Sequence, residues 1–133
     1  MKIQFYENNQ FSESDYIDIF SSIYNKKPDL NYWNWRYKNN PFNKNTHISY
    51  IKDKNKIISY YAISESRFIC DDENIKCGLM TAAMTHPSYT GRGIFAKLEV
   101  SLHDHLFNKH NFDFLYGFAN HNAHRIHRKY ANW

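Results

Sequence analysis

From about residue 12 onward, hydrophobic residues recur at the spacing of an α-helix. Apolar side chains recur at three- and four-residue intervals from Tyr16 to Tyr24, which predicts an amphipathic helix. Ser12 can cap the first turn of this helix, with Asp15 three residues further on. A second, shorter helix is predicted between Asp29, which can cap it, and Pro41, which ends it.

Polar and apolar residues alternate in strand-like fashion at the start and in the middle of the chain. The alternation predicts a short strand at residues 2–5 and three strands from His47 onward. Tight turns are expected at residues 53–55 and 71–74, so these three strands should form antiparallel hairpins. Pro87 limits the last of them because proline cannot donate to a sheet ladder.

The last third of the chain returns to the helical period. A long amphipathic helix is predicted over residues 94–108, a short buried strand over 112–118 and a final helix over 120–130. A strand-helix-strand unit should form a right-handed crossover with parallel strands. We therefore predict a single α+β domain over residues 1–133, with a mixed and mostly antiparallel sheet.

Composition excludes several classes of protein. The chain has 133 residues, of which 42% are hydrophobic and 18% aromatic, so it should fold around one core. No apolar run approaches the roughly 20 residues of a membrane span, and the N-terminus lacks a secretory signal. The net charge is +4, but the basic residues are scattered. We predict a cytoplasmic protein that binds neither nucleic acid nor membrane.

Cysteine and histidine residues suggest two alternatives that we do not favour. If residues 70–77 form a hairpin, Cys70 and Cys77 could face each other as a cross-strand disulfide, but a reducing cytoplasm argues against it. His121, His124 and His127 recur every three residues and could share a helix face. No acidic partner lies nearby in the sequence, so we expect no metal ion.

The stretch THPSYTGRGIFAKL marks the junction between the last hairpin strand and the long helix. A helix N-terminus presents unpaired backbone N–H groups and a partial positive charge, which can hold phosphate oxygens. Gly91 and Gly93 allow positive φ and close approach of an anion, and Arg92 could add a charge-assisted contact. The alternative is a helix start that merely needs a flexible entry. The stretch matches neither the P-loop nor the dinucleotide fingerprint.

This stretch, extended back to Met84, resembles the pyrophosphate-binding segment of the GNAT superfamily of N-acetyltransferases. The order of elements also matches that fold, and FDFLYGFANHNAHRIHRKYANW is similar to the strand and helix that follow in the family. The resemblance implies acetyl-CoA as co-substrate. The cofactor-binding residues that it implies are Met84, Thr85, Thr90, Gly91, Arg92, Gly93, Ile94, Phe95, Asn120 and Asn122. Many members have Gly or Ala at Phe95, which is tolerable if this side chain points into the core.

The same resemblance suggests catalytic candidates. Acetyl transfer to an amine needs a base for the ammonium proton and an acid for the leaving thiolate. His127 stands where a tyrosine often serves as the acid in the family, and Tyr130 is a second candidate. His86 could be a base acting through water. Each has a simpler alternative: His127 as a partly exposed helix residue, and His86 as the end of a strand.

The second predicted helix suggests the class of acceptor. In this fold it borders the acceptor groove, and Trp33, Trp35, Arg36 and Tyr37 lie on it. An aromatic wall with an arginine suits a sugar, although any one of these rings could instead belong to the core. The resemblance thus implies an acyl-CoA-dependent N-acyltransferase that acts on an amine or hydroxyl of a small molecule. The alternative is a non-catalytic acyl-CoA-binding or interaction domain.

The resemblance also bears on assembly. The family fold continues with two more strands after the last helix, so we expect a domain that is incomplete at its C-terminus. The strand at residues 112–118 would then keep an open edge, which invites pairing with another chain. We therefore predict a homodimer, or a partner chain that completes the sheet.

Overall fold

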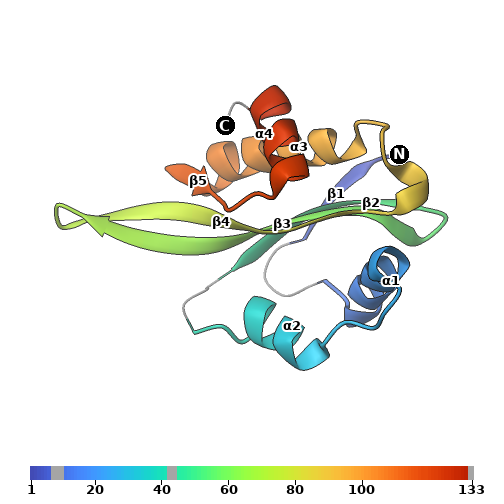
Figure 1. Cartoon of the computed structure of the whole chain (residues 1–133). Coiled ribbons are helices and arrows are strands. Elements are labelled where there is room, and N and C mark those ends of the chain that lie inside the picture. The colour runs from blue at the N-terminus through green and yellow to red at the C-terminus, as the bar shows by residue number, and fades with distance from the viewer. Residues whose placement is uncertain (7–10, 42–44, 132–133) are drawn as a thin grey trace.

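A five-stranded sheet separates two pairs of helices in the computed structural model, which describes residues 1–6, 11–41 and 45–131 (Figure 1). The strands are β1 (Ile3–Tyr6), β2 (Thr46–Asp53), β3 (Lys56–Cys70), β4 (Glu73–Thr85) and β5 (Phe114–Tyr116). The helices are α1 (Glu13–Tyr24), α2 (Leu30–Tyr37), α3 (Ile94–His110) and α4 (His121–Tyr130), with a short 3-10 helix, η1 (Pro87–Tyr89). The predicted α+β class and the order of elements are confirmed.

Side-chain caps start the first two helices as the sequence predicts. Ser12 Oγ accepts a hydrogen bond from the backbone N–H of Asp15 at 3.1 Å. Asp29 Oδ1 accepts one from the N–H of Tyr32, also at 3.1 Å. The end of α2 differs from the prediction, because the helix ends at Tyr37 and not at Pro41. Lys38 is its C-cap, and the backbone N–H groups of Lys38 and Asn39 both donate to the carbonyl oxygen of Asn34.

Both hairpins turn on two residues with positive φ, at 54–55 and 71–72. Such pairs match the right-handed twist of the flanking strands. The second turn places Cys70 opposite Glu73, whereas Cys77 is buried further along β4. Both thiols are free, and the alternative of a cross-strand disulfide was wrong because the two cysteines lie on different rungs of the ladder.

Strand β5 pairs with β4 over a very short length. The pairing is parallel, as predicted, but it covers only Cys77 to Leu79 of β4. Gly78 permits this approach, since a Cβ there would lie 2.5 Å from Ile63 Cγ2 and 2.8 Å from Leu115 Cδ2. Beyond Leu79, the outer edge of β4 faces no strand among the described residues. The predicted strand over 112–118 is thus much shorter in the structure.

Each face of the sheet has its own apolar core. On the face covered by α1 and α2, Trp33 and Tyr60 are almost fully buried. On the other face, α3 contributes Leu98, Leu102 and Leu106, which are completely buried. Among the described residues, no helix has both the length and the apolar character needed to cross a bilayer.

A group of polar side chains is buried between β3, α3 and α4. Tyr61 Oη and His103 Nε2 lie 3.1 Å apart, and Glu99 Oε1 shares a short hydrogen bond with His127 Nδ1. Burial, together with the nearby His127, lowers the pKa of His103 to about 4. Burial alone raises the pKa of Glu99 to about 7 and lowers the pKa of His127. His103 is therefore neutral in the folded protein at neutral pH.

This neutral state predicts acid-sensitive stability. The folded-state pKa of His103 lies below its ordinary value of 6.5. The stability that the neutral imidazole contributes is therefore fully present above pH 6.5 and is lost as the pH falls towards the folded-state pKa. Between those two pKa values the loss amounts to about 3 kcal/mol of unfolding free energy. Chemical denaturation of wild type and His103→Leu at neutral and acidic pH measures it. The variant should show a shallower dependence on pH.

The quantity to compare is the slope of the unfolding free energy against pH. Its absolute value also changes, because leucine at position 103 removes the partner of the Tyr61 hydroxyl. His121→Gln is the control, since His121 is exposed at the start of α4 and its loss should leave the slope unchanged. Equal slopes for wild type and His103→Leu would contradict the buried, neutral state of His103.

Candidate functional site

A cleft of about 480 Å³ opens beside the free edge of β4. The N-terminal end of α3 and the turn before it form one wall, α4 forms another, and the end of α1 closes the third side. The lining residues are Ile23, Tyr24, Ala83, Met84, Thr85, Tyr89, Thr90, Gly91, Gly93, Ile94, Phe95, Ala96, Asn120, Asn122, Ala123, Ile126 and Tyr130. The short β4–β5 pairing creates this space, because a longer β5 would occupy it.

The start of α3 has no side-chain cap. Its N-cap residue is Gly93, with φ of 69°, and Gly91 has φ of 75°, so both have the left-handed conformation expected from the sequence. A Cβ built at either glycine would meet nothing within 4 Å. The backbone amides of the first turn therefore adjoin open space at the positive end of a 17-residue helix. Such an end suits a phosphate group.

Arg92 does not line the cleft. Its guanidinium donates to the carbonyl oxygen of Ser88 at 3.0 Å and lies over the Tyr89 ring, 5.1 Å from the centroid. Tyr89 in turn donates to Asp53 Oδ2 at 2.5 Å, which ties η1 to the β2–β3 turn. The observed contacts of Arg92 support the loop, and its predicted contact with phosphate stays a prediction.

All of the other predicted cofactor-binding residues meet in the cleft. Met84 and Thr85 come from β4, and Asn120 and Asn122 come from the start of α4. The loop and the start of α3 contribute Thr90, Gly91, Gly93, Ile94 and Phe95. The Phe95 ring packs edge-on against the rings of Tyr61 and His127, which accounts for a large residue at this position. Asn120 Oδ1 is engaged as the cap of α4, where it accepts from the N–H of Ala123 at 2.9 Å.

The predicted catalytic residues are distributed differently. Tyr130 lines the cleft and is 49% exposed. His127 is 1% exposed and bonds to Glu99 beneath the cleft, so it is not the partly exposed residue considered as its alternative. His86 also lies outside the lining, and its Nδ1 accepts from the N–H of Ser88 at 3.2 Å. Of these candidates, Tyr130 has the best access to a ligand in the cleft.

A second cavity of about 250 Å³ lies between α2 and the strands β3 and β4. Its lining residues are Trp35, Arg36, Asn40, Ser64, Glu65, Ser66, Leu79 and Thr81. Thr81 is two residues from Ala83 of the cleft, so the two spaces border the same strand. Sequence reasoning identified the helical wall of this cavity, but it missed the hydroxyl groups that β3 and β4 contribute.

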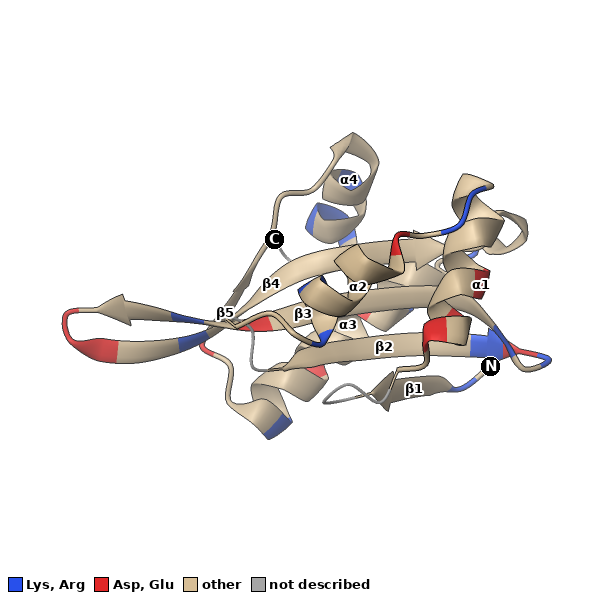
Figure 2. Ribbon diagram, turned by 90° about the horizontal axis from the view of Figure 1, so that it is seen from below, with Lys and Arg blue, Asp and Glu red and all other residues tan. Residues whose placement is uncertain are grey.

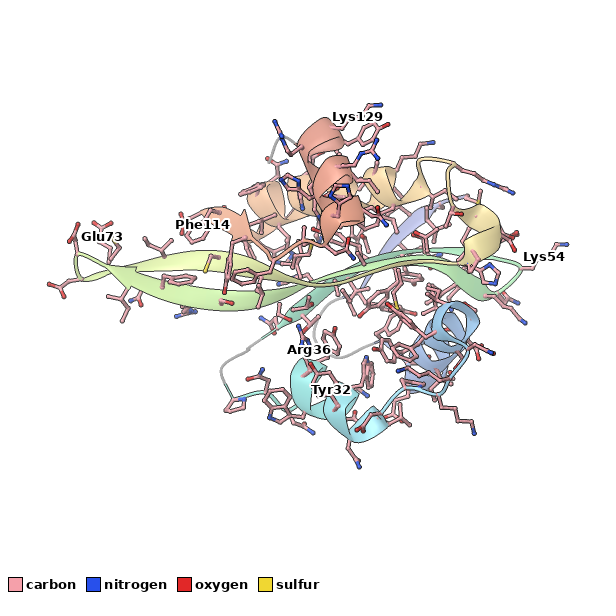
Figure 3. All side chains as sticks on the ribbon, viewed as in Figure 1. Tyr32, Arg36, Lys54, Glu73, Phe114 and Lys129 are labelled. Atoms are coloured by element: carbon pink, nitrogen blue, oxygen red, sulfur yellow. The ribbon has the colours of Figure 1, made fainter. Side chains whose placement is uncertain are left out.

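Helix α2 divides its aromatic residues between the core and this cavity. Trp33 and Tyr37 are buried, as the alternative for these rings proposed, whereas Tyr32 and Trp35 are about half exposed. Arg36 extends from α2 towards the sheet and donates to the hydroxyl of Tyr32 at 2.5 Å (Figure 3). Trp35 and Arg36 are therefore the members of the predicted set that line the second cavity.

Within the described ranges, no three His, Cys, Asp or Glu side chains are placed to hold a metal ion. His121 and His124 are exposed, while His127 is turned into the interior.

Comparison with solved structures shows the same fold in several acetyltransferases. A predicted acetyltransferase from Clostridium acetobutylicum, solved with acetyl-CoA, aligns with a TM-score of 0.68 and 18% identity over 97% of this chain and 88% of that one. Glucosamine-6-phosphate N-acetyltransferase from Arabidopsis thaliana aligns with a TM-score of 0.67 and 12% identity, over 98% of this chain and 91% of that one. Ribosomal-protein-alanine N-acetyltransferase from Brucella melitensis biovar Abortus 2308 aligns with a TM-score of 0.66 and 10% identity, over 99% of this chain and 90% of that one.

Sequence comparison assigns the family. None of the curated proteins matches the chain at a significant level. A family model described as an acetyltransferase (GNAT) domain matches residues 7–130, which is nearly the whole chain. The chain therefore belongs to the GNAT acetyltransferase domain family.

Proposed function

We propose that the protein transfers an acetyl group from acetyl-CoA to an amine or hydroxyl of a small polar molecule. The observation that carries this proposal is the uncapped start of α3, where two glycines with positive φ adjoin an open cleft. We propose that the amides of Ile94, Phe95 and Ala96 donate to the pyrophosphate of the cofactor. Acetyl-CoA supplies the activated thioester. A structure solved with acetyl-CoA shares this fold, which supports the proposal.

The free edge of β4 provides the second contact. Between Met80 and Thr85 the strand is bonded to β3 on one side only, within the described residues. Its outer N–H and C=O groups can pair with the amides of an extended pantetheine arm, as a peptide adds to a sheet edge. This pairing would direct the thioester along β4 towards Thr81 and the second cavity.

Tyr130 is the group that we propose as the acid for the leaving thiolate. Once the acceptor amine has formed its bond to the carbonyl carbon, the hydroxyl can donate a proton to sulfur as the carbon–sulfur bond breaks. The proton that the amine loses goes to solvent, and the phenolate regains one from there. We assign no catalytic role to His127, which is buried away from the cleft, or to His86, which lies outside the lining. The alternative is a non-catalytic domain that binds acyl-CoA in the same cleft. It differs from the proposed enzyme because it would not turn the acyl-CoA over.

The second cavity is our candidate for the acceptor site. Structural neighbours include an aminoglycoside acetyltransferase solved with sisomicin and a glucosamine-6-phosphate N-acetyltransferase. In this chain the cavity combines the exposed face of Trp35 with the hydroxyls of Ser64, Ser66 and Thr81. An aromatic face beside several hydroxyl groups suits a sugar ring. We propose an amino sugar as the acceptor, and a cytoplasmic location, which the free thiols of both cysteines support.

A carboxylate at the start of α3 should abolish cofactor binding. We expect Gly93→Asp to weaken acetyl-CoA binding at least about 100-fold, because the new charge opposes the pyrophosphate and a side chain occupies its place. Isothermal titration calorimetry measures the dissociation constant. Gly93→Ala is the control for backbone strain at positive φ, and Asn108→Asp adds the same charge at an exposed position of α3.

Binding to Gly93→Asp with the wild-type affinity would refute the proposed cofactor site. Turnover of wild type with a panel of amines then separates the two proposals, since the non-catalytic domain would bind acetyl-CoA and release no free thiol.

Truncation of Trp35 should affect the acceptor selectively. We expect Trp35→Ala to raise the KM for an amino sugar about tenfold through the loss of an exposed aromatic face, with an unchanged affinity for acetyl-CoA. Steady-state kinetics with a thiol-detecting reagent measures the KM, and isothermal titration calorimetry measures the affinity for acetyl-CoA. Phe107→Ala, at an exposed aromatic residue of α3 that lines neither space, is the control. An unchanged KM would exclude the second cavity as the acceptor site.

The open edge of β5 carries our proposal for a partner. Strand β5 lies at one end of the sheet. Phe114 on β5 and Phe68 on β3 are both exposed, and their ring centroids lie 5.7 Å apart. The tip of the β3–β4 hairpin is acidic, and basic residues follow further back along both of its strands (Figure 2). There Arg67 of β3 pairs with Lys76 of β4. Two copies could pair through these open β5 edges about a two-fold axis.

We expect a homodimer in solution, with a mass that multi-angle light scattering reports as twice that of the chain. Phe114→Lys should give a monomer, because it places a charge on the edge that two copies would share. Phe107→Lys puts the same charge on an exposed position of α3 and should leave the dimer intact. A wild-type monomer at all concentrations would contradict this proposal.

A further inference from the structure

We propose that Glu99 and His127 form the anchor that holds α4 against α3 and so fixes the position of one wall of the cleft. His127 is then a positioning residue, which acts through the helix that carries it. The anchor can be tested without any ligand, while its effect on acetyl-CoA rests on the proposed function.

Helix α4 has few other attachments. Among its residues only His127 is buried, Ala123 and Ile126 are partly buried, and the rest are exposed. The segment that leads into α4 is also exposed, with Phe118 at 91%. A ten-residue helix is marginally stable in water by itself, so its place depends on these few contacts.

The anchoring contact is specific in its chemistry. Glu99 belongs to the buried face of α3, next to Leu98 and one turn from Leu102, and it has no exposed surface. A carboxyl group in such a place is stable only when it is hydrogen-bonded, and here its partner is His127 Nδ1. The Phe95 ring meets the His127 ring edge-on at 6.0 Å and fixes the imidazole from the other side. The pair therefore sets both the distance and the rotation of α4.

The same helix presents its neighbouring residues to the cleft. Ala123, Ile126 and Tyr130 all line it, and with His127 they follow the spacing of one helical stripe. A turn or shift of α4 would thus move the whole wall, including the proposed acid. Tyr61 and His103 complete the polar surroundings of Glu99 from β3 and α3.

Hydrogen exchange on the ligand-free protein tests the anchor directly. We expect His127→Leu to raise exchange of the α4 amides at least about tenfold, since it leaves Glu99 buried without its partner, while the amides of α3 keep their protection. Glu99→Gln retains the side-chain volume and a hydrogen-bonding group, so its α4 amides should exchange at rates within about threefold of wild type. His124→Leu makes the same substitution on the exposed face of α4 and should change nothing.

Calorimetry with acetyl-CoA on the same variants supplies the second readout. We expect the affinity of His127→Leu to fall about tenfold and that of Glu99→Gln to remain near wild type. Unchanged exchange of α4 in His127→Leu would overturn the anchor, as would an equal rise across α3 and the sheet, because the pair would then serve overall stability. If α4 alone loosens but wild type does not bind acetyl-CoA, the anchor stands and the proposed function fails.

Discussion

The structure depends on how briefly β5 pairs with β4. Three residues of β4, from Cys77 to Leu79, are bonded to it, and Gly78 allows the close contact. Within the described residues, the rest of β4 is left with one free edge, and the start of α3 and α4 line the cleft beside it. A sheet edge with unpaired backbone groups is ordinarily a liability. Here the surrounding helices convert it into the floor of a cleft.

The helix that follows this strand supplies the electrostatic half of the site. Its start has neither an acidic residue in the first turn nor a side-chain cap, although a cap would have stabilised the isolated helix. The protein thus gives up a local stabilising contact at the point where a ligand would make the same hydrogen bonds. Departures from local rules of this kind are expected at functional sites.

Much of the fold could be predicted from the sequence because its signals are local. The caps at Ser12 and Asp29 and the apolar stripe of α3 follow from neighbours a few residues apart. The left-handed glycines at the start of α3 could be predicted because Gly91 and Gly93 are adjacent in the chain to this helix.

The remaining features depend on distant contacts. Glu99 and His127 are 28 positions apart, so neither the burial of the histidine nor its partner could be read from local spacing. The apolar run at 112–118 overstates β5, since Phe112 packs into the core outside the strand and Phe118 is almost fully exposed. The hydroxyls of the second cavity come from two strands whose register only the fold determines.

The bond between Tyr89 and Asp53 has a consequence for the rate of association. It fastens the glycine-containing loop to the turn at the far end of the β2–β3 hairpin, and Arg92 stacks on the same tyrosine. A loop held in this way does not have to be ordered when an anion arrives, so little conformational entropy is lost at that moment. Capture should then be limited by diffusion and by the field at the helix end, with no slow closing step.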